Sequence, residues 1–217
     1  MIGIIDYGMG NLHSVSKALE RLGIPYLISD QPVELNQATG YILPGVGAFP
    51  DAMATLEQTG MRSFLDEYVY GKKPLLGICL GMQLLFQSSK EYGDTSGLGY
   101  LPGKVKRFDG FDSKGLPYKV PHMGWNKLCF EKDALIVKDI SVGHVYFVHS
   151  FLVNTIDDVI VASSDYYQKV PAIVQKGSVY GMQFHPEKSG TVGMSLLKRF
   201  GQIVEGNSYD LNNLSSD

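Results

Sequence analysis

Short apolar runs alternate with longer amphipathic segments along the first half of the chain. The apolar runs predict buried strands at residues 2–5, 25–28, 41–43 and 74–78. Between them, hydrophobic side chains recur at helical spacing and predict helices at about residues 11–22, 51–70 and 80–88. Strands without polar positions are buried on both faces, so the alternation indicates a parallel sheet with helices on each side.

The second half is different, because strand-like segments follow one another with few helices. Strands are predicted at residues 118–121, 127–130, 145–153, 159–163, 172–175 and 179–184, with a hairpin turn at Lys176-Gly177. A last helix is predicted at 190–204. The predicted fold class is therefore α/β, an open, mainly parallel sheet flanked by helices, with an antiparallel extension.

Length and composition narrow the picture further. A chain of 217 residues suits one domain, which we expect at 1–204, followed by a polar, frayed or disordered tail at 205–217. The formal net charge of −3 gives no broad basic surface for nucleic acid. No apolar run approaches the roughly 18 residues that span a membrane, and the first residues do not resemble a signal peptide.

Only two cysteines are present, Cys79 and Cys129, which is not a disulfide framework. Cysteines and histidines do not cluster at the spacing of a zinc site. We therefore expect a cytoplasmic protein without a metal or cofactor, and without a membrane or nucleic-acid partner.

The strongest chemical signal is the segment Gly77-Ile78-Cys79-Leu80-Gly81, where a predicted strand meets a predicted helix. A nucleophile between glycines at such a junction is typical of a nucleophile elbow, whose helix N-terminus favours a thiolate. The alternative is a small inert core cysteine. Cys129 lies in an apolar pattern without such a context, and we expect it in the core.

A base for this cysteine is suggested by His185-Pro186-Glu187 at the end of a predicted strand. In extended chain, residues two apart project to the same side, so Glu187 can orient the imidazole of His185. The alternative is a solvated surface loop. His149 is a competing base, although a hydrogen-bonded histidine near the core is the more ordinary interpretation of its apolar surroundings.

The loop Pro44-Gly45-Val46-Gly47 follows a strand at the same predicted sheet edge. Its N–H groups, with that of Leu80, could hold a developing oxyanion. The alternative is an ordinary turn. The loop is not a phosphate-binding loop, because no Gly-Lys-Ser/Thr follows it.

Together, the Pro-Gly-Val-Gly loop, the Gly-Ile-Cys-Leu-Gly-Met-Gln elbow and Gln183-Phe184-His185-Pro186-Glu187 resemble the class I glutamine amidotransferases. Further motifs are Asp6-Tyr7-Gly8-Met9-Gly10-Asn11, Pro-His-Met-Gly-Trp-Asn at 121–126 and Tyr-Phe-Val-His-Ser-Phe at 146–151. This set is similar to the glutaminase subunits of imidazole glycerol phosphate synthases, which act in histidine biosynthesis. The resemblance covers about residues 2–202.

The resemblance implies that Cys79 attacks the side-chain amide of L-glutamine, and that His185, oriented by Glu187, protonates the departing ammonia and later activates water. The implied oxyanion donors are Val46, Gly47 and Leu80. The implied glutamine-binding residues are Gln83, His149, Ser150 and Phe151. The implied partner face consists of Pro121, His122, Met123, Gly124, Trp125 and Asn126. The implied partner is a (β/α)8-barrel cyclase subunit, which receives the ammonia in a heterodimer.

Three rival hypotheses stay open. A paralogous amidotransferase subunit that supplies ammonia for amidination of a surface sugar would keep the same motifs. A non-catalytic subunit on the same fold is a second possibility, against which the complete Cys-His-Glu set argues. The third is an independent cysteine peptidase or hydrolase with the same sheet architecture.

Overall fold

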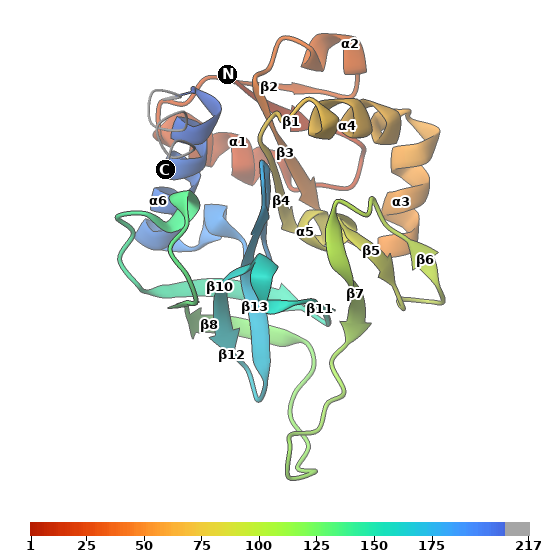
Figure 1. The fold of residues 1–217 in the computed structure, drawn as a ribbon, viewed down its shortest axis with the longest axis vertical. Coiled ribbons are helices and arrows are strands. Elements are labelled where there is room, and N and C mark those ends of the chain that lie inside the picture. Colours follow the sequence, from red (N-terminus) through yellow and green to blue (C-terminus); the bar gives the residue numbers. More distant parts are fainter. Residues whose placement is uncertain (207–217) are drawn as a thin grey trace.

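The computed structural model describes residues 1–206, and its largest element is an eight-stranded sheet with the order β2-β1-β3-β4-β14-β13-β12-β9 (Figure 1). Its strands are β1 (Ile2–Ile5), β2 (Tyr26–Ser29), β3 (Gly40–Gly45), β4 (Leu75–Cys79), β9 (Cys129–Phe130), β12 (Ile160–Asp165), β13 (Lys169–Lys176) and β14 (Val179–Met182). Neighbours from β2 to β14 pair in parallel, and those from β14 to β9 pair antiparallel. The predicted fold class is confirmed.

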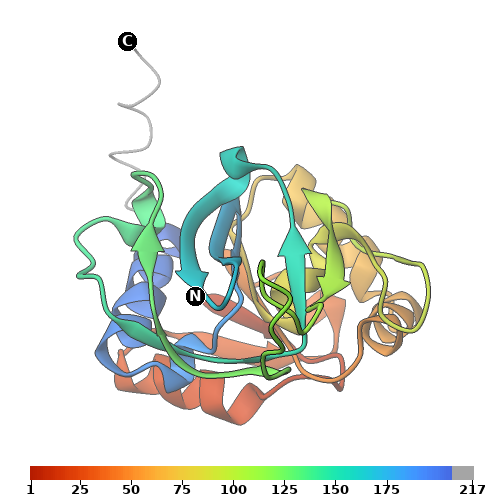
Figure 2. The ribbon, with the colours of Figure 1, turned by 90° about the horizontal axis from the view of Figure 1, so that it is seen from below.

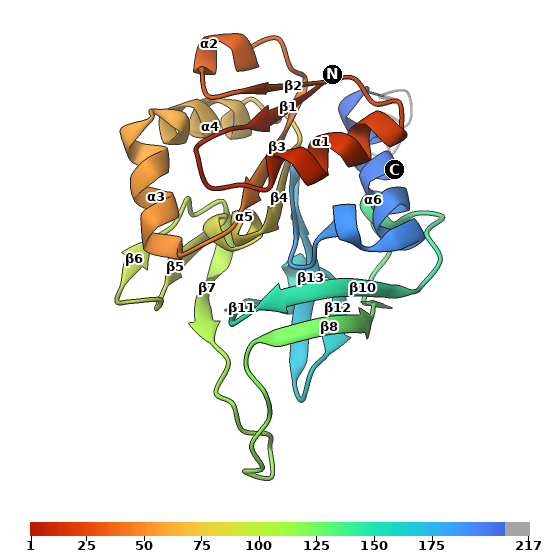
Figure 3. The same cartoon turned by 180° about the vertical axis from the view of Figure 1, so that it is seen from behind.

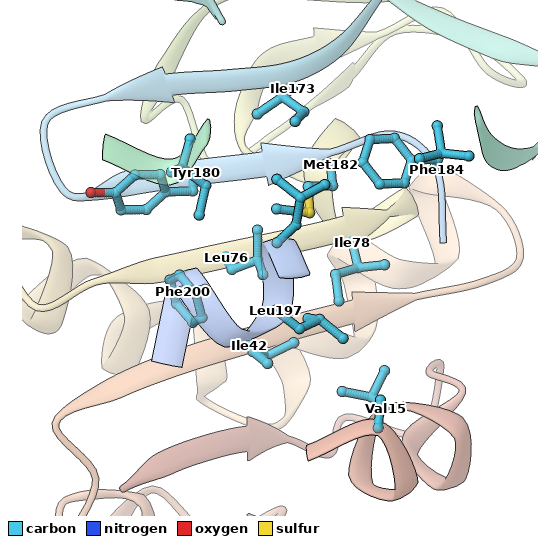
Figure 4. Packing of buried hydrophobic residues seen from close by; sticks show 14 of the residues in the cluster. Val15, Ile42, Leu76, Ile78, Ile173, Tyr180, Met182, Phe184, Leu197 and Phe200 are labelled. Atoms are coloured by element: carbon cyan, nitrogen blue, oxygen red, sulfur yellow. The ribbon is translucent and has the colours of Figure 1, made fainter. Parts of the chain in front are cut away.

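Helices cover both faces of the parallel strands, as the alternating sequence pattern requires. One face packs on α1 (Leu12–Arg21) and α6 (Gly190–Val204), and Figure 4 shows Leu197 and Phe200 of α6 lying against Ile42 and Leu76 of the sheet. The other face packs on α3 (Phe49–Gln58), α4 (Met61–Tyr70) and α5 (Leu80–Leu84). A short helix, α2 (Pro32–Leu35), follows β2.

The prediction of one helix over residues 51–70 is wrong. The segment forms α3 and α4, because Gly60 between them has a φ of 74°, a left-handed conformation that glycine adopts without a steric penalty. The helix predicted at 80–88 is also too long, since α5 ends at Leu84 and strand β5 (Phe86–Ser89) follows. Short apolar runs fit a strand as well as a helix, which explains the error.

Strands outside the main sheet form two smaller sheets instead of a single extension. The segment 145–153 divides at Ser150 into β10 (His144–His149) and β11 (Phe151–Asn154). Strand β10 pairs antiparallel with β8 (His122–Lys127), so the strand predicted at 118–121 lies too early in the chain. The second small sheet has the order β11-β7-β5-β6, with β6 (Thr95–Ser96) and β7 (Leu101–Arg107).

The β8–β10 pair lies crosswise to the β12–β13 hairpin, as the views from below and from behind show (Figures 2 and 3). The N–H of His185 donates to the carbonyl of Tyr146 at 3.0 Å, which ties β10 to the segment after β14. This bond brings two distant parts of the sequence together at the end of the parallel strands, where the elbow also lies.

Three remaining expectations concern the tail, Cys129 and membrane segments. Most of the predicted tail, residues 207–217, lies outside the described residues. Cys129 is exposed instead of buried, because in the short edge strand β9 its side chain is not covered. Within residues 1–206, no helix has both the length and the apolar character to cross a membrane.

Candidate active site

Cys79 is the last residue of β4, and its backbone has φ 56° and ψ −113°, an unusual conformation for a residue with a side chain. The neighbouring glycines make this turn possible. A Cβ on Gly77 would lie 2.5 Å from the carbonyl oxygen of Gly81, and a Cβ on Gly81 would lie 1.9 Å from that of Leu43. The predicted elbow is therefore present, with strain at its nucleophile.

His185 is held beside this cysteine. Its Nδ1 lies 2.8 Å from Oε1 of Glu187, and both side chains are almost fully buried, at 5% and 1% exposure. The carboxylate can only accept, so Nδ1 carries a proton and Nε2 is the nitrogen available to the sulfur. The structure thus brings together Cys79, His185 and Glu187, in the arrangement of a nucleophile, a base and an orienting acid.

Burial and hydrogen bonding act in opposite directions on His185. Burial disfavours the charged imidazolium and lowers its pKa, but hydrogen bonds and charge interactions with Cys79 and Glu187 outweigh burial and raise the pKa to about 9. His185 therefore carries a positive charge at neutral pH.

A cavity of about 280 Å³ opens in front of the sulfur. Its lining includes most of the predicted site residues, namely Val46, Gly47, Cys79, Leu80, Gln83, His149, Phe151 and His185, together with Val148 and Glu91, which were not predicted. Ser150 and Glu187 are the two exceptions, and Glu187 lies behind His185, to which it is hydrogen-bonded. The site contains two carboxylates, Glu91 and Glu187, and only Glu187 is hydrogen-bonded to His185.

Gln83 and Phe151 form one wall of this cavity. The amide Nε2 of Gln83 donates to the carbonyl of Phe151 and to Oε1 of Gln183, both at 3.0 Å. The same carbonyl accepts from Nδ1 of His149 at 2.6 Å. His149 is thus a hydrogen-bonded buried histidine, as its ordinary interpretation suggested, and its burial lowers its pKa to about 3.

In the candidate oxyanion loop, the N–H of Val46 is occupied by another partner in this conformation. The N–H of Val46 donates to the carbonyl of Met9 at 2.9 Å. Gly47 has a φ of 99°, in the region that favours glycine. The oxyanion roles of Val46, Gly47 and Leu80 stay predictions, and for Val46 the peptide group would first have to rotate.

Two side chains in the site were not found from the sequence. Glu91 is buried and accepts the N–H of Phe49 at 2.8 Å through Oε2, in a turn that follows β5. Tyr7 is also buried, and its hydroxyl has no hydrogen-bond partner in the structure. Burial and the charge of Cys79 both raise the pKa of Tyr7. No local signal in the sequence marks Glu91, whereas Tyr7 belongs to the Asp6-Tyr7-Gly8-Met9-Gly10-Asn11 motif without an assigned role.

The predicted partner face is only partly a surface. Along β8, Met123 and Trp125 are 54% and 55% exposed, whereas His122 is completely buried. Pro121, Gly124 and Asn126 are half-buried. Side chains alternate across a strand, so His122 belongs to the interior face and is wrongly assigned to the surface.

The α/β fold and the buried set of Cys79, His185 and Glu187 are the arrangement expected of a cysteine-dependent amidotransferase. The chain belongs to the family "Glutamine amidotransferase class-I", whose model matches residues 3–203, and it is a glutamine amidotransferase. The resemblance stated from the sequence motifs is thereby confirmed.

Two relatives of the chain carry the same name. The chain is 69% identical over 207 residues to "Imidazole glycerol phosphate synthase subunit HisH" of Shouchella clausii, which covers 95% of this chain and 100% of the relative. The protein of the same name from Bacillus subtilis is 53% identical over 205 residues, covering 94% and 97%.

Solved structures share the fold. A chain described as "Crystal structure of glutamine amidotransferase" has a TM-score of 0.72 at 21% identity, covering 94% of this chain and 98% of that one. The glutaminase domain of Trypanosoma brucei CTPS, with bound acivicin, has a TM-score of 0.59 at 18% identity, covering 93% of each chain.

Replacing Glu187 by glutamine is expected to lower the pKa of His185 from about 9 by about 1–3 pH units, because the neutral amide cannot stabilise the imidazolium by charge. Titration of the His185 ring nitrogens by ¹⁵N NMR measures this directly. Loss of the proton should move to lower pH in the variant. The control is Glu57→Gln, which removes a surface carboxylate paired with Arg62. Equal midpoints in all three proteins would contradict the assigned role of Glu187.

Proposed function

We propose that the chain is the glutaminase subunit of an imidazole glycerol phosphate synthase. It hydrolyses L-glutamine to glutamate and ammonia, and it passes the ammonia to a (β/α)8-barrel cyclase partner in a heterodimer. The observation that carries the chemistry is the hydrogen-bonded Cys79, His185 and Glu187 set at the head of the cavity. The pathway is supported by the 69% identity to a HisH subunit.

In the proposed reaction, the sulfur of Cys79 attacks the side-chain amide carbon of glutamine, and the carbonyl oxygen takes up the negative charge. His185 gives a proton to the amide nitrogen, the C–N bond breaks, and ammonia leaves a thioester on the sulfur. His185 then takes a proton from water, whose oxygen attacks the thioester carbon. The C–S bond breaks, and glutamate leaves. Glu187 keeps Nδ1 of His185 protonated throughout.

Glu91 and Gln83 are proposed to bind the amino-acid end of the substrate. The carboxylate of Glu91 lines the cavity and is not paired with the histidine, so it can attract the α-ammonium group. Gln83 also lines the cavity, and two hydrogen bonds fix its side chain. Two recognition groups on one substrate end would orient the amide toward Cys79.

The proposed partner face centres on Met123 and Trp125. Large apolar side chains that project from a strand into solvent are typical of a protein interface, and tryptophan is enriched at the energetic centres of such interfaces. The pair lies on β8, which is joined to the pocket wall through β10. A cyclase bound there would sit close to the elements that line the cavity.

Glutaminase activity is expected to fall more than about 10³-fold in Cys79→Ala, because the nucleophile is lost. The assay compares the chain alone and with its cognate cyclase and the cyclase's nucleotide ligand. Cys129→Ala is the matched control, since this exposed cysteine lies outside the cavity.

Stimulation by the cyclase that disappears in Cys79→Ala would support both the chemistry and the pathway. Turnover that ignores the cyclase but needs Cys79 would point to another synthase, such as one that amidinates a sugar. Turnover that survives Cys79→Ala would overturn the mechanism.

The hydrogen bond between Val46 and Met9 is expected to break when the enzyme becomes active. One missing oxyanion donor lowers the rate by about 10²–10³-fold, so a free chain with this N–H turned away should be nearly idle. Crystal structures with a glutamine analogue, with and without the cyclase, test this. A free chain of low activity whose Val46 N–H already points at the analogue would contradict the explanation.

Glu91→Gln is expected to raise KM for glutamine by about 10–100-fold with little change in kcat, because a charge-assisted bond to the substrate is lost equally in the ground and transition states. The glutamine side chain can still accept the N–H of Phe49, which protects the fold. Asp94→Asn is the control, because it neutralises an exposed carboxylate three residues further along the chain. A fall in kcat at constant KM would reject this role.

A further inference from the structure

A continuous chain of hydrogen bonds crosses the interior between the glutamine pocket and the partner face. It begins at the carbonyl of Phe151, which accepts from Nδ1 of His149 at 2.6 Å. Nε2 of His149 lies 3.0 Å from Nδ1 of His122, whose Nε2 lies 2.9 Å from Oδ1 of Asn126. The chain ends where Nδ2 of Asn126 donates to the carbonyl of Asp165 at 2.9 Å.

Aromatic rings hold the two imidazoles in place. The ring of His122 is stacked between Phe147 and Tyr166, with centroids 4.5 Å and 4.0 Å away. Phe108 lies 5.2 Å from the ring of His149. Because the rings have little room to turn, the nitrogens keep the partners described above.

The donors in this series of hydrogen bonds supply fewer protons than its four links require. Both ends are carbonyl oxygens, which only accept, so each of the four links needs its own proton. Asn126 supplies one to Asp165, and neutral His149 and His122 supply one each. Three protons for four links leave two acceptors facing each other somewhere in the chain.

The geometry places this conflict at the outer end. The 2.6 Å link to Phe151 requires a proton on Nδ1 of His149, and the next link then takes the proton on Nδ1 of His122. Neutral His122 consequently turns a bare Nε2 toward the oxygen of Asn126. Turning the amide over would only move the conflict to Asp165.

One added proton on Nε2 of His122 satisfies all four links. The charged and titratable groups that face the pair are few: His185 acts on His149, and the phenol ring of Tyr166 covers His122. Burial lowers the pKa of His122, whereas its bond to Asn126 acts in the opposite direction. His149, with a pKa near 3, is the poorer site for the proton.

We propose that His122 and His149 are positioning residues for glutamine binding, joined to Asn126 on the partner face in a chain that is complete only with one additional proton. Their effect reaches the substrate because the carbonyl of Phe151 accepts from both His149 and Gln83. The identity of the substrate rests on the proposed function. The chain of hydrogen bonds itself does not.

Protonation of His122 and binding of a partner therefore both act on Oδ1 of Asn126. At a pH above the pKa of His122, the lone pair on its Nε2 repels the oxygen of Asn126, which can then turn toward a donor on the partner. At a pH below this pKa, protonated Nε2 donates a hydrogen bond to Asn126. In both states, the half-buried amide of Asn126 links the partner face to the pocket wall.

The first experiment measures glutamine binding by calorimetry to the chain carrying Cys79→Ala, so that no turnover occurs. His122→Phe keeps the ring stacking but leaves His149 without its donor, and is expected to weaken binding by about 5–30-fold. His122→Gln, whose amide can still donate to His149, should restore binding to within about threefold of the reference. His144→Phe, an exposed histidine on the same β10 strand, is the control.

Equal binding by His122→Phe and the reference would overturn the positioning role. Equal losses in the phenylalanine and glutamine variants would do so too, because they would indicate packing instead of a donor. If the reference protein binds no glutamine, the proposed substrate is wrong. The hydrogen-bond chain is then tested by the NMR experiment on the histidine ring nitrogens alone.

The second experiment follows the histidine ring nitrogens by ¹⁵N NMR as a function of pH. We expect His149 to carry a proton only on Nδ1, and His122 to gain its second proton as the pH falls, in step with a shift of the Asn126 side-chain amide. Asn126→Asp should move this step to higher pH, because a carboxylate stabilises the imidazolium. A bare Nδ1 on His149, or a step that Asn126→Asp does not move, would overturn the proposal.

Discussion

The close approach of β4 and α5 to β3 is the constraint on which the rest of the site depends. There is no room for a side chain at Gly81, where a Cβ would lie 1.9 Å from the carbonyl oxygen of Leu43. This contact allows Cys79 to take its left-handed backbone and to stand above the end of the sheet. Gly77 and Gly81 therefore position Cys79, and the cavity, His185 and Glu187 are arranged around its sulfur.

Around that nucleophile, burial and charge are kept in balance. A buried imidazole alone would be neutral at pH 7, but the partners of His185 reverse the effect of burial on its pKa. His149, equally close to the cavity, has a carbonyl and another histidine as partners and stays neutral. Two neighbouring histidines therefore differ in charge because only His185 has both Cys79 and Glu187 beside it.

Local patterns predicted the parallel sheet, the elbow and the His-Pro-Glu unit, because each is determined by residues a few positions apart. Glu91 could not be found this way, since its place depends on the N–H of Phe49, which lies 42 residues earlier. The break at Gly60 was missed because the apolar period continues across it. For His122 the signal was present: alternation along β8 separates it from Met123 and Trp125.

In this structure, the N–H group of Val46 that is proposed to stabilise the oxyanion is already hydrogen-bonded to the carbonyl of Met9. Buried donors without partners are costly, so the chain by itself is more stable with the Val46 N–H bound to Met9 than with this group aimed at the sulfur. Aiming that donor at the substrate requires a compensating interaction. A partner that contacts Asn126 or Trp125 could supply it, since both residues lie on the strand that pairs with the β10 wall of the cavity. Low activity in the free state would then follow from ordinary hydrogen-bond satisfaction.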